Sequence, residues 1–350
     1  MVHDVKYRFT MWNNSRISYG TKKVKIKMEA IMNKVLEEIK KIGIVPVVVL
    51  DDAKDAEPLA KALCEGGLPC AEVTFRTEAA EESIRIISEK YPEMLVGAGT
   101  VLTTEQVDRA VAAGAKFIVS PGFNPKVVKY CIDRDIPVTP GTQTPSEMEQ
   151  AIEMGLDVVK FFPAEPAGGL KMIKAVAAPY TMLQFMPTGG INLNNVEEYL
   201  EYDRILACGG SWMVKKDLVA AGEFDKIRDL TKEAVQTMLG FELAHIGINC
   251  DSEAEAEKTA DAFDGLFGFT KKVGNSSVFA GKAVEAMKSK GLGAKGHIAV
   301  ATNSVVRAKN YLEMMGYKFN EESAKFKGDK MTAIYLADEI GGFAVHLVQK

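Results

Sequence analysis

The chain has 350 residues, 47% of them hydrophobic and 26% charged, which is the composition of an ordinary globular protein of about two domains and excludes a disordered or fibrous chain. Its 43 Lys and Arg residues and 47 Asp and Glu residues give a net charge of -4, which argues against a nucleic-acid partner. No stretch is apolar enough for a membrane helix or a secretory signal. We therefore expect a cytoplasmic protein with no membrane partner.

Residues 1–31 differ from the rest of the chain, because seven Lys and Arg residues face only Asp4 and Glu29 and no apolar period is sustained. We expect a basic, flexible N-terminal extension or translation from an upstream start codon. A targeting peptide is the alternative, although an amphipathic pattern rich in Arg and Ser is not clear here. Met32 is a natural beginning for the helix that follows.

The five cysteines are odd in number, form no CxxC motif and mostly lie in apolar runs. This pattern is typical of free, buried thiols in a reducing compartment. We expect neither disulfides nor a cysteine metal site.

Residues 32–240 alternate short apolar or β-branched runs with helical stretches of about ten residues, which indicates a parallel sheet. Eight such units in roughly 200 residues favour a (β/α)8 TIM barrel over an open doubly wound sheet, which more often has five or six strands. The expected strands are 44–50, 70–75, 94–97, 116–119, 136–139, 157–162, 183–187 and 205–208. The expected helices include 56–64, 78–89, 104–113, 125–134, 145–154, 170–177 and 224–239.

Residues 243–350 contain a weak internal repeat. A strand beginning at His245 leads into a helical run over 253–266, and a strand beginning at His297 leads into a helical run over 304–315. Each copy continues into strand-like segments, at 277–287 and 331–348. The overall fold class is therefore α/β, a TIM barrel followed by a smaller α+β domain of two βαβββ repeats.

Lys160 is the strongest candidate for chemistry in the barrel. It lies among Val and Phe residues in an expected strand, where burial disfavours the ammonium form, and a neutral amine can attack a ketone to form a Schiff base. The alternative is a structural lysine in the barrel interior, paired with a carboxylate.

The second strand offers a partner for this lysine. Period-two alternation places Glu72, Thr74 and Arg76 on one face. A buried carboxylate can serve as general acid and base, and the Arg76 guanidinium can hold a substrate carboxylate with two parallel hydrogen bonds. The alternative is an internal ion pair between Glu72 and Arg76.

Glycine pairs follow the last two strands, at Gly189–Gly190 and Gly209–Gly210. Loops after strands seven and eight of TIM barrels commonly bind phosphate, and glycines let backbone N–H groups approach an anion closely. Segment 97–100 looks like part of a dinucleotide fingerprint but lacks the final glycine, so we expect no nicotinamide site there.

Six motifs together resemble the class I 2-dehydro-3-deoxy-phosphogluconate / 4-hydroxy-2-oxoglutarate (KDPG/KHG) aldolases. The resemblance covers about residues 32–240. The motifs, in chain order, are EVTFRT at Glu72–Thr77, GAGTVL at Gly97–Leu102, SPG at Ser120–Gly122, KFFPAE at Lys160–Glu165, PTGGI at Pro187–Ile191 and GGSW at Gly209–Trp212.

This resemblance implies a carbon–carbon lyase without a cofactor, a homotrimer and a place in the Entner–Doudoroff pathway. It implies cleavage of KDPG to pyruvate and glyceraldehyde 3-phosphate, of 4-hydroxy-2-oxoglutarate to pyruvate and glyoxylate, or both. The implied catalytic residues are Lys160, as the Schiff-base lysine, and Glu72, as the proton-transfer residue. The implied substrate contacts are Arg76, Thr100 and Pro121 around the pyruvate moiety, Phe162, Thr188 at the aldol centre, and Gly189, Gly190, Gly210 and Ser211 at the phosphate.

Two other functions are compatible with such a barrel: a phosphate-binding isomerase or decarboxylase, and a non-catalytic sugar-phosphate sensor. Lys160 with Glu72 argues against both, because neither function needs a lysine that traps an electrophile.

The second domain contains three of the four histidines. His245 and His297 open the first strands of the two copies, while Glu285 and His346 lie in their late strands. Pairing of the copies about a pseudo-twofold axis would bring these residues into one open site suited to Zn²⁺, Ni²⁺ or Fe²⁺. The arrangement resembles the glyoxalase / vicinal-oxygen-chelate superfamily, with a histidine where that superfamily often has Glu. The alternatives are strand histidines without a metal, and a domain that regulates or assembles the aldolase.

Overall fold

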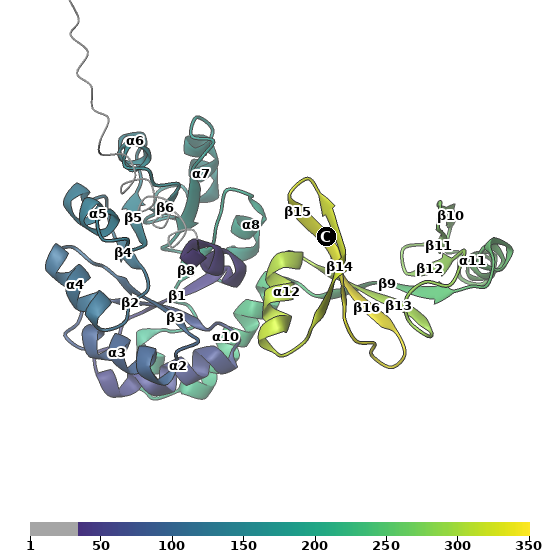
Figure 1. Ribbon diagram of the computed structural model, residues 1–350, viewed down its shortest axis with the longest axis horizontal. Helices are drawn as coiled ribbons and strands as arrows, with labels where there is room; N and C mark the ends of the chain where they lie inside the picture. The colour runs from purple at the N-terminus through teal and green to yellow at the C-terminus, as the bar shows by residue number, and fades with distance from the viewer. Residues whose placement is uncertain (1–33) are drawn as a thin grey trace, which may run out of the picture.

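The computed structural model describes residues 34–350, which form a barrel and a separate sheet-built domain side by side (Figure 1). The sequence-based expectations for residues 1–31, and for a helix beginning at Met32, lie outside the described residues.

Eight parallel strands form the barrel, in the order β7-β6-β5-β4-β3-β2-β1-β8. Two isolated parallel bridges, Phe185 with Ile205 and Thr188 with Gly209, bring the two ends of this series together. The predicted TIM barrel is therefore confirmed. The strands are β1 (Ile44–Val48), β2 (Cys70–Thr74), β3 (Leu95–Gly99), β4 (Ile118–Ser120), β5 (Val138–Thr142), β6 (Val158–Phe161), β7 (Gln184–Pro187) and β8 (Cys208–Gly210).

Helices surround this ring, and several begin at a side-chain cap directly after a strand and its loop. Thr103 accepts a hydrogen bond from the Gln106 N–H, and Asn124 accepts one from the Lys126 N–H. Apart from a helical segment over 34–42, the helices are η1 (Ala53–Asp55), α2 (Ala56–Glu65), α3 (Ala80–Lys90), α4 (Thr104–Ala112), α5 (Pro125–Ile132), α6 (Pro145–Glu153), α7 (Gly169–Ala177), α8 (Val196–Glu201), α9 (Lys216–Ala220) and α10 (Phe224–Leu239).

The barrel strands differ from their predicted ranges by a few residues at their ends, and β5 and β8 differ most. β5 extends to Thr142 rather than ending at Thr139, and β8 begins at Cys208, where the predicted strand ended. Both segments contain residues that are depleted in strands, a Pro-Gly pair in β5 and a Gly-Gly pair in β8. Strand propensity is weak at these positions, and backbone hydrogen bonds to the neighbouring strands of the barrel determine the structure instead.

The second domain is one eight-stranded sheet built from two βαβββ units, as predicted. Its strand order, β10-β11-β12-β9-β13-β16-β15-β14, is symmetric about the antiparallel central pair β9 and β13. The first unit is β9 (Glu242–Asn249), α11 (Glu253–Phe267), β10 (Lys271–Val273), β11 (Ser277–Ala280) and β12 (Val284–Met287). The second is β13 (Gly296–Thr302), α12 (Val305–Met314), β14 (Phe319–Lys327), β15 (Lys330–Leu336) and β16 (Ala344–Gln349).

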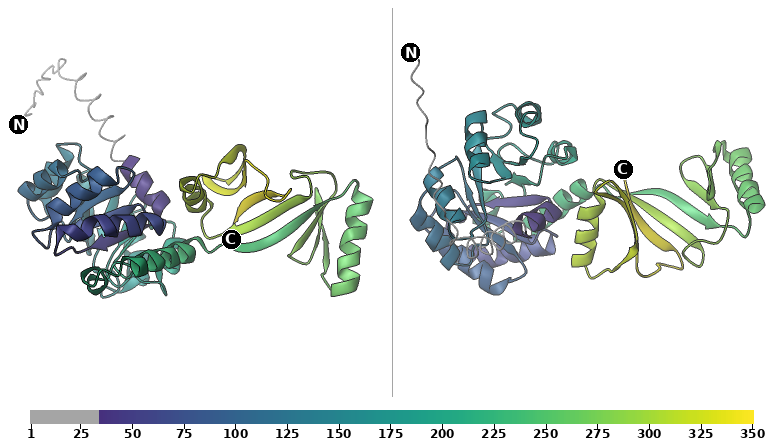
Figure 2. Two further views of the ribbon diagram at one scale, coloured as in Figure 1. Left: turned by 90° about the horizontal axis from the view of Figure 1, so that it is seen from below. Right: turned by 45° about the horizontal axis from the view of Figure 1, so that its top comes forward.

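The two units relate differently to the barrel. One continuous apolar core runs from the barrel into the second unit and includes Val305, Ala308 and Leu347, whereas the first unit has a small core of its own around Ala256 and Ala260. Figure 2 likewise shows α12 next to the barrel and α11 at the far end of the molecule. The second unit is therefore a packed extension of the barrel.

Arg307 of α12 anchors this contact. Its Nε donates to the Lys40 carbonyl at 3.2 Å, and its terminal nitrogen donates to the Leu206 carbonyl at 3.3 Å. A methyl group at Gly43 would lie 2.9 Å from Arg307 Cδ. Because Gly43 and Leu206 precede β1 and β8, the second domain packs beside the beginnings of these two strands, at the end of the barrel opposite the rim where the strands end.

All five cysteines are free thiols, and only Cys64 is not fully buried. Burial raises the pKa of the Cys64, Cys131 and Cys208 thiols to about 12, so these thiols stay protonated at neutral pH. No helix among residues 34–350 is long and apolar enough to cross a membrane.

Replacing Arg307 tests the domain contact. We expect Arg307→Ala to lower the free energy of unfolding by about 2 kcal/mol, because hydrogen bonds from a charged group contribute roughly 1.5–3 kcal/mol and the Lys40 and Leu206 carbonyls lose their donor. Arg85→Ala, at a partly exposed arginine of α3, should cost less than about 1 kcal/mol. Urea unfolding of both variants measures the difference; equal losses would contradict the anchoring role.

Candidate functional site

Lys160 of β6 and Glu72 of β2 meet inside the barrel. Lys160 Nζ lies 3.2 Å from Glu72 Oε1, and the side chains are 5% and 1% exposed, respectively. Burying a charged group is costly unless the charge is paired, so each of these groups stabilises the charge of the other in the apolar interior. The second carboxylate oxygen, Glu72 Oε2, is buried and has no hydrogen-bond partner within the described chain. It is therefore free to accept a proton from a bound molecule or water.

The sequence left open whether Glu72 pairs with Arg76, and the structure does not form that pair. Arg76 is exposed beyond the end of β2, and its Nε donates to Thr100 Oγ1 at 3.1 Å. Thr100 has φ +55°, a left-handed conformation that is uncommon for a residue other than glycine. The loop after β3 thus holds the Thr100 hydroxyl against Arg76, next to the rim of the barrel.

Two further predicted substrate contacts, Pro121 at the pyruvate moiety and Phe162, directly follow β4 and β6. Ser120 Oγ donates to the Gly122 carbonyl at 2.8 Å and so fixes the turn that contains Pro121. The ring of Phe162 lies 5.3 Å from Lys160 Nζ, within the range of a cation–π contact. Both residues follow strand ends on the rim that carries Arg76 and Thr100.

The two glycine-pair loops lie beside each other, because Thr188 bridges to Gly209 in parallel. Gly189 and Gly190 have φ values of +99° and +89°. The Gly190 carbonyl accepts hydrogen bonds from the side chains of Asn192 and Asn195 at 3.0 and 3.1 Å, which fixes the orientation of this loop.

The neighbouring side chains differ in exposure. Thr188 is buried, and its Oγ1 has no partner within the described residues. Gly210 is buried at the end of β8, and Ser211 is exposed next to it. The predicted phosphate residues thus gather on one side of the rim.

Sequence reasoning missed two polar contacts of this site. Thr142, at the end of β5, donates to the Lys160 carbonyl at 3.2 Å. Tyr199 of α8 donates a short hydrogen bond to Glu165 in the loop after β6. The position of Thr142 at a strand end was an available signal, but the predicted strand stopped three residues earlier.

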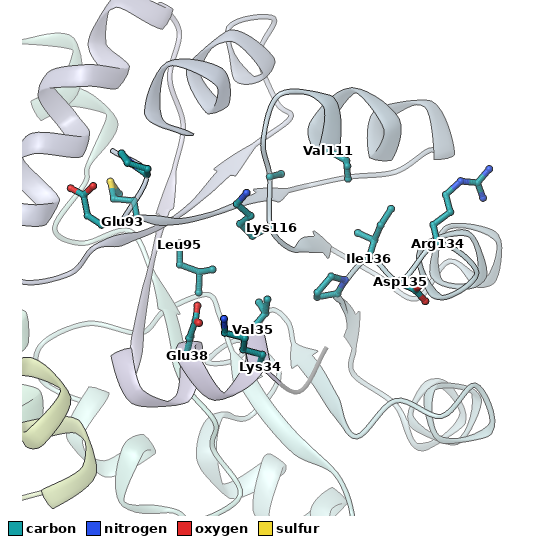
Figure 3. Close-up of a pocket in the computed structure, with 14 residues that line it drawn as sticks. Lys34, Val35, Glu38, Glu93, Leu95, Val111, Lys116, Arg134, Asp135 and Ile136 are labelled. Carbon is teal, nitrogen blue, oxygen red and sulfur yellow. The ribbon is translucent and has the colours of Figure 1, made fainter. Parts of the chain in front are cut away.

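A pocket of about 490 Å³ lies at the other end of the barrel (Figure 3). Its lining includes Leu95, Lys116 and Ile136, which stand at or before the beginnings of β3, β4 and β5. Active sites of TIM barrels lie at the opposite rim. This pocket is therefore not part of the Lys160 site.

In the second domain, four candidate ligands surround the central strand pair. The register places Gly247 of β9 between Glu285 and His297, and Ala299 of β13 between His245 and His346. A side chain at Gly247 would overlap the imidazole of His297. Small residues at the centre thus let the four side chains converge.

Three of these side chains meet at one point. The Nε2 atoms of His245 and His297 are 3.2 Å apart, and each is 3.1 Å from Glu285 Oε2. Burial alone would raise the pKa of Glu285, but hydrogen bonds from His245, His297 and Ser277 outweigh it and hold the pKa well below its usual range. The carboxylate is therefore ionised.

His346 completes the cluster, since its ligand atom lies within 4.8 Å of those of His245 and His297. Burial, reinforced by electrostatic repulsion from His297 and His245, lowers the pKa of His346 to about 4, so its imidazole is neutral at pH 7. Both of its ring nitrogens are buried without a partner within the described residues, and its ring stacks on Tyr335 at 4.5 Å. Sequence reasoning did not single out Ser277 or Tyr335.

Comparison with known proteins identifies the barrel. The family model "KDPG and KHG aldolase" matches residues 35–230. A 2-dehydro-3-deoxy-phosphogluconate aldolase of Treponema pallidum is 50% identical over 202 residues, which are 58% of this chain and 96% of that protein.

Two solved structures agree with this match. The KDPG aldolase of Legionella pneumophila, with pyruvate captured as a covalent carbinolamine, shares 37% identity at a TM-score of 0.55, covering 56% of this chain and 96% of that one. The Zymomonas mobilis enzyme with 3-phosphoglycerate shares 40% identity at a TM-score of 0.54, covering 59% and 95%. The chain therefore belongs to the KDPG and KHG aldolase family, and its barrel is that of a carbon–carbon lyase.

Proposed function

We propose that the barrel cleaves KDPG to pyruvate and glyceraldehyde 3-phosphate, and 4-hydroxy-2-oxoglutarate to pyruvate and glyoxylate, through a Schiff base on Lys160. The observation that carries this proposal is the buried contact of Lys160 with Glu72 in a barrel of this family. The glycine pairs at the rim and the exposed Ser211 favour the phosphorylated substrate, since backbone N–H groups and a hydroxyl suit an anion.

Proton transfer between the two side chains starts the reaction. Glu72 Oε1, 3.2 Å from Lys160 Nζ, accepts a proton from the ammonium group. The neutral amine attacks the C2 ketone. The resulting carbinolamine takes the proton back from Glu72 and loses water to give an iminium ion, which leaves Glu72 ionised again. The guanidinium of Arg76 holds the substrate carboxylate, which lies next to C2.

Cleavage then uses the iminium as an electron sink. The C3–C4 bond breaks, its electron pair enters the iminium to give an enamine, and the C4 hydroxyl proton passes to Glu72, directly or through water. The aldehyde leaves, Glu72 returns this proton to C3 of the enamine, and water hydrolyses the iminium to pyruvate and free Lys160. No step requires a metal or an organic cofactor.

Borohydride reduction with pyruvate tests this function. Wild-type protein should gain the mass of one reduced pyruvyl group, and Lys160→Met, which keeps the apolar stem, should gain none. Lys116→Met, at an exposed lysine near the other end of the barrel, should still form the adduct. Intact-mass spectrometry measures the outcome; an adduct that persists in Lys160→Met, or its absence from folded wild-type protein, would contradict the proposal.

We further propose that His245, Glu285, His297 and His346 hold a divalent metal such as Zn²⁺, Ni²⁺ or Fe²⁺. The residues fit such an ion, because imidazole and carboxylate are its usual ligands and both nitrogens of His346 are buried without a hydrogen-bond partner among residues 34–350. A bound ion would supply Lewis-acid chemistry to a ligand oxygen at an open position. Ser277 donates to Glu285 Oε1 at 2.6 Å and keeps the carboxylate facing the histidines.

Metal loading tests this site. After incubation of metal-free protein with each ion and desalting, we expect about one retained ion per chain for at least one metal. The variant with His245→Ala and His297→Ala should retain less than about a tenth of that amount, because three or four ligands are needed to hold the ion. His3→Ala, at the histidine that precedes the described residues, serves as the control. Elemental analysis that finds equal metal in both variants would refute the assignment.

We also propose a homotrimer in the cytoplasm. The family resemblance supports the trimer, and the five free, mostly buried thiols support a reducing compartment. Light scattering after gel filtration should give three times the mass of one chain; a monomer or an even-numbered oligomer would rule the trimer out.

A further inference from the structure

Strand β3 has no side chains on its inward face beside the Lys160 site. Gly97 and Gly99 alternate with apolar residues along β3, and the register places Gly97 opposite Glu72 and Gly99 opposite Thr74. Residues paired in this way across a parallel sheet point to the same side. Both glycines therefore face the barrel interior together with Glu72.

Different neighbours occupy the two spaces that these glycines leave. A methyl group at Gly99 would lie 2.6 Å from Cγ and 2.8 Å from Cδ of Glu72, and closer still to Oε1. At Gly97, a methyl group would instead overlap the ring of Phe117, which is 1% exposed. Gly99 thus borders the ionisable carboxylate, whereas Gly97 borders an apolar core side chain.

We propose that Gly99 is a positioning residue for the aldolase reaction: its missing side chain forms the space in which the Glu72 carboxylate reaches Lys160. The backbone of β3 is held by hydrogen bonds to β2 and β4, so it cannot retreat readily. The flexible group is the Glu72 side chain. A β-carbon at position 99 therefore displaces this carboxylate from its 3.2 Å contact with Lys160 Nζ.

The inference rests on the proposed Schiff-base function, and pyruvate separates the two claims. Lys160 Nζ adds to C2 of pyruvate, water leaves, and borohydride traps the iminium. Removal of a C3 methyl proton from the iminium gives the enamine, and return of a deuteron from D₂O leaves deuterium in the pyruvate methyl group. Trapping therefore measures Schiff-base formation on Lys160. Methyl exchange measures proton transfer, whose rate depends on the position of the Glu72 carboxylate.

The matched variants are Gly99→Ala and Gly97→Ala, the same substitution two residues apart on one strand face. We expect Gly99→Ala to trap pyruvate but to exchange methyl protons about 10- to 100-fold more slowly per trapped site, since a misplacement of about 1 Å can cost that much. Gly97→Ala should exchange within about twofold of wild type, because it leaves the carboxylate in place. Mass spectrometry and proton NMR give the two readouts.

Two results would overturn the inference: wild-type exchange in Gly99→Ala, or an equal loss in both variants. Wild-type protein that traps no pyruvate would instead overturn the aldolase function itself, so the two failures are distinguishable.

Thermal unfolding tests the proposed steric contact between position 99 and Glu72 without an activity assay. Glu72→Ala removes the carboxylate, so Gly99→Ala should lower Tm by about 4 °C less in that background than in wild type. The Gly97→Ala shift should be the same in both backgrounds. If Gly99→Ala alone fails to fold, the double variant with Glu72→Ala should fold; a double variant no more stable than Gly99→Ala alone would overturn the proposal.

Discussion

The cost of burying a charge organises the catalytic half of this protein. An ammonium group and a carboxylate, both almost without exposure, remain inside the barrel because Lys160 and Glu72 neutralise each other at 3.2 Å. Both side chains are almost fully buried, so their electrostatic interaction is stronger than it would be in water. The same contact lets a proton pass from Lys160 Nζ to Glu72 Oε1 without movement of either side chain, so the ion pair can also take part in the reaction.

The barrel provides this environment by distributing its side chains unevenly. The long polar side chain of Glu72 on β2 extends into the space that Gly99 on β3 leaves free, whereas Gly141 on β5, next to Lys160 in the register, leaves room for the Pro121 backbone. The second domain packs at the opposite end through Arg307, where it does not obstruct the rim that carries Arg76 and Thr100. The two candidate sites of the chain are therefore physically separate.

Much of this was predictable from sequence, because periodicity and motif order are local signals. The eight strand-helix units, the two βαβββ units and the candidate ligands all followed from such signals. The charged strands β10 and β14 did not, since Lys271–Val273 and Phe319–Lys327 lack a clear alternation and form strands only by pairing with β11 and β15. The contact between α12 and the barrel also escaped prediction, because no local sequence pattern shows which groups a half-buried arginine such as Arg307 contacts.

The residues of the two sites could be predicted from the sequence more readily than their geometry. The sequence did not decide whether Glu72 pairs with Arg76 or with Lys160. The closed ring of strands decides it, because side chains of β2 and β6 meet across the barrel interior. In the second domain, the convergence of His245, His297 and Glu285 depends on the register of β9 with β12 and β13. Register over such sequence distances is set by tertiary pairing, which a single sequence does not reveal.

A crystal structure of the protein soaked with pyruvate tests the central claim most directly. The account predicts continuous electron density from Lys160 Nζ to C2 of pyruvate, with the pyruvate carboxylate at Arg76 and Glu72 within hydrogen-bond distance of the new centre. Pyruvate bound without a covalent bond, with the contact between Lys160 and Glu72 unchanged, would contradict it.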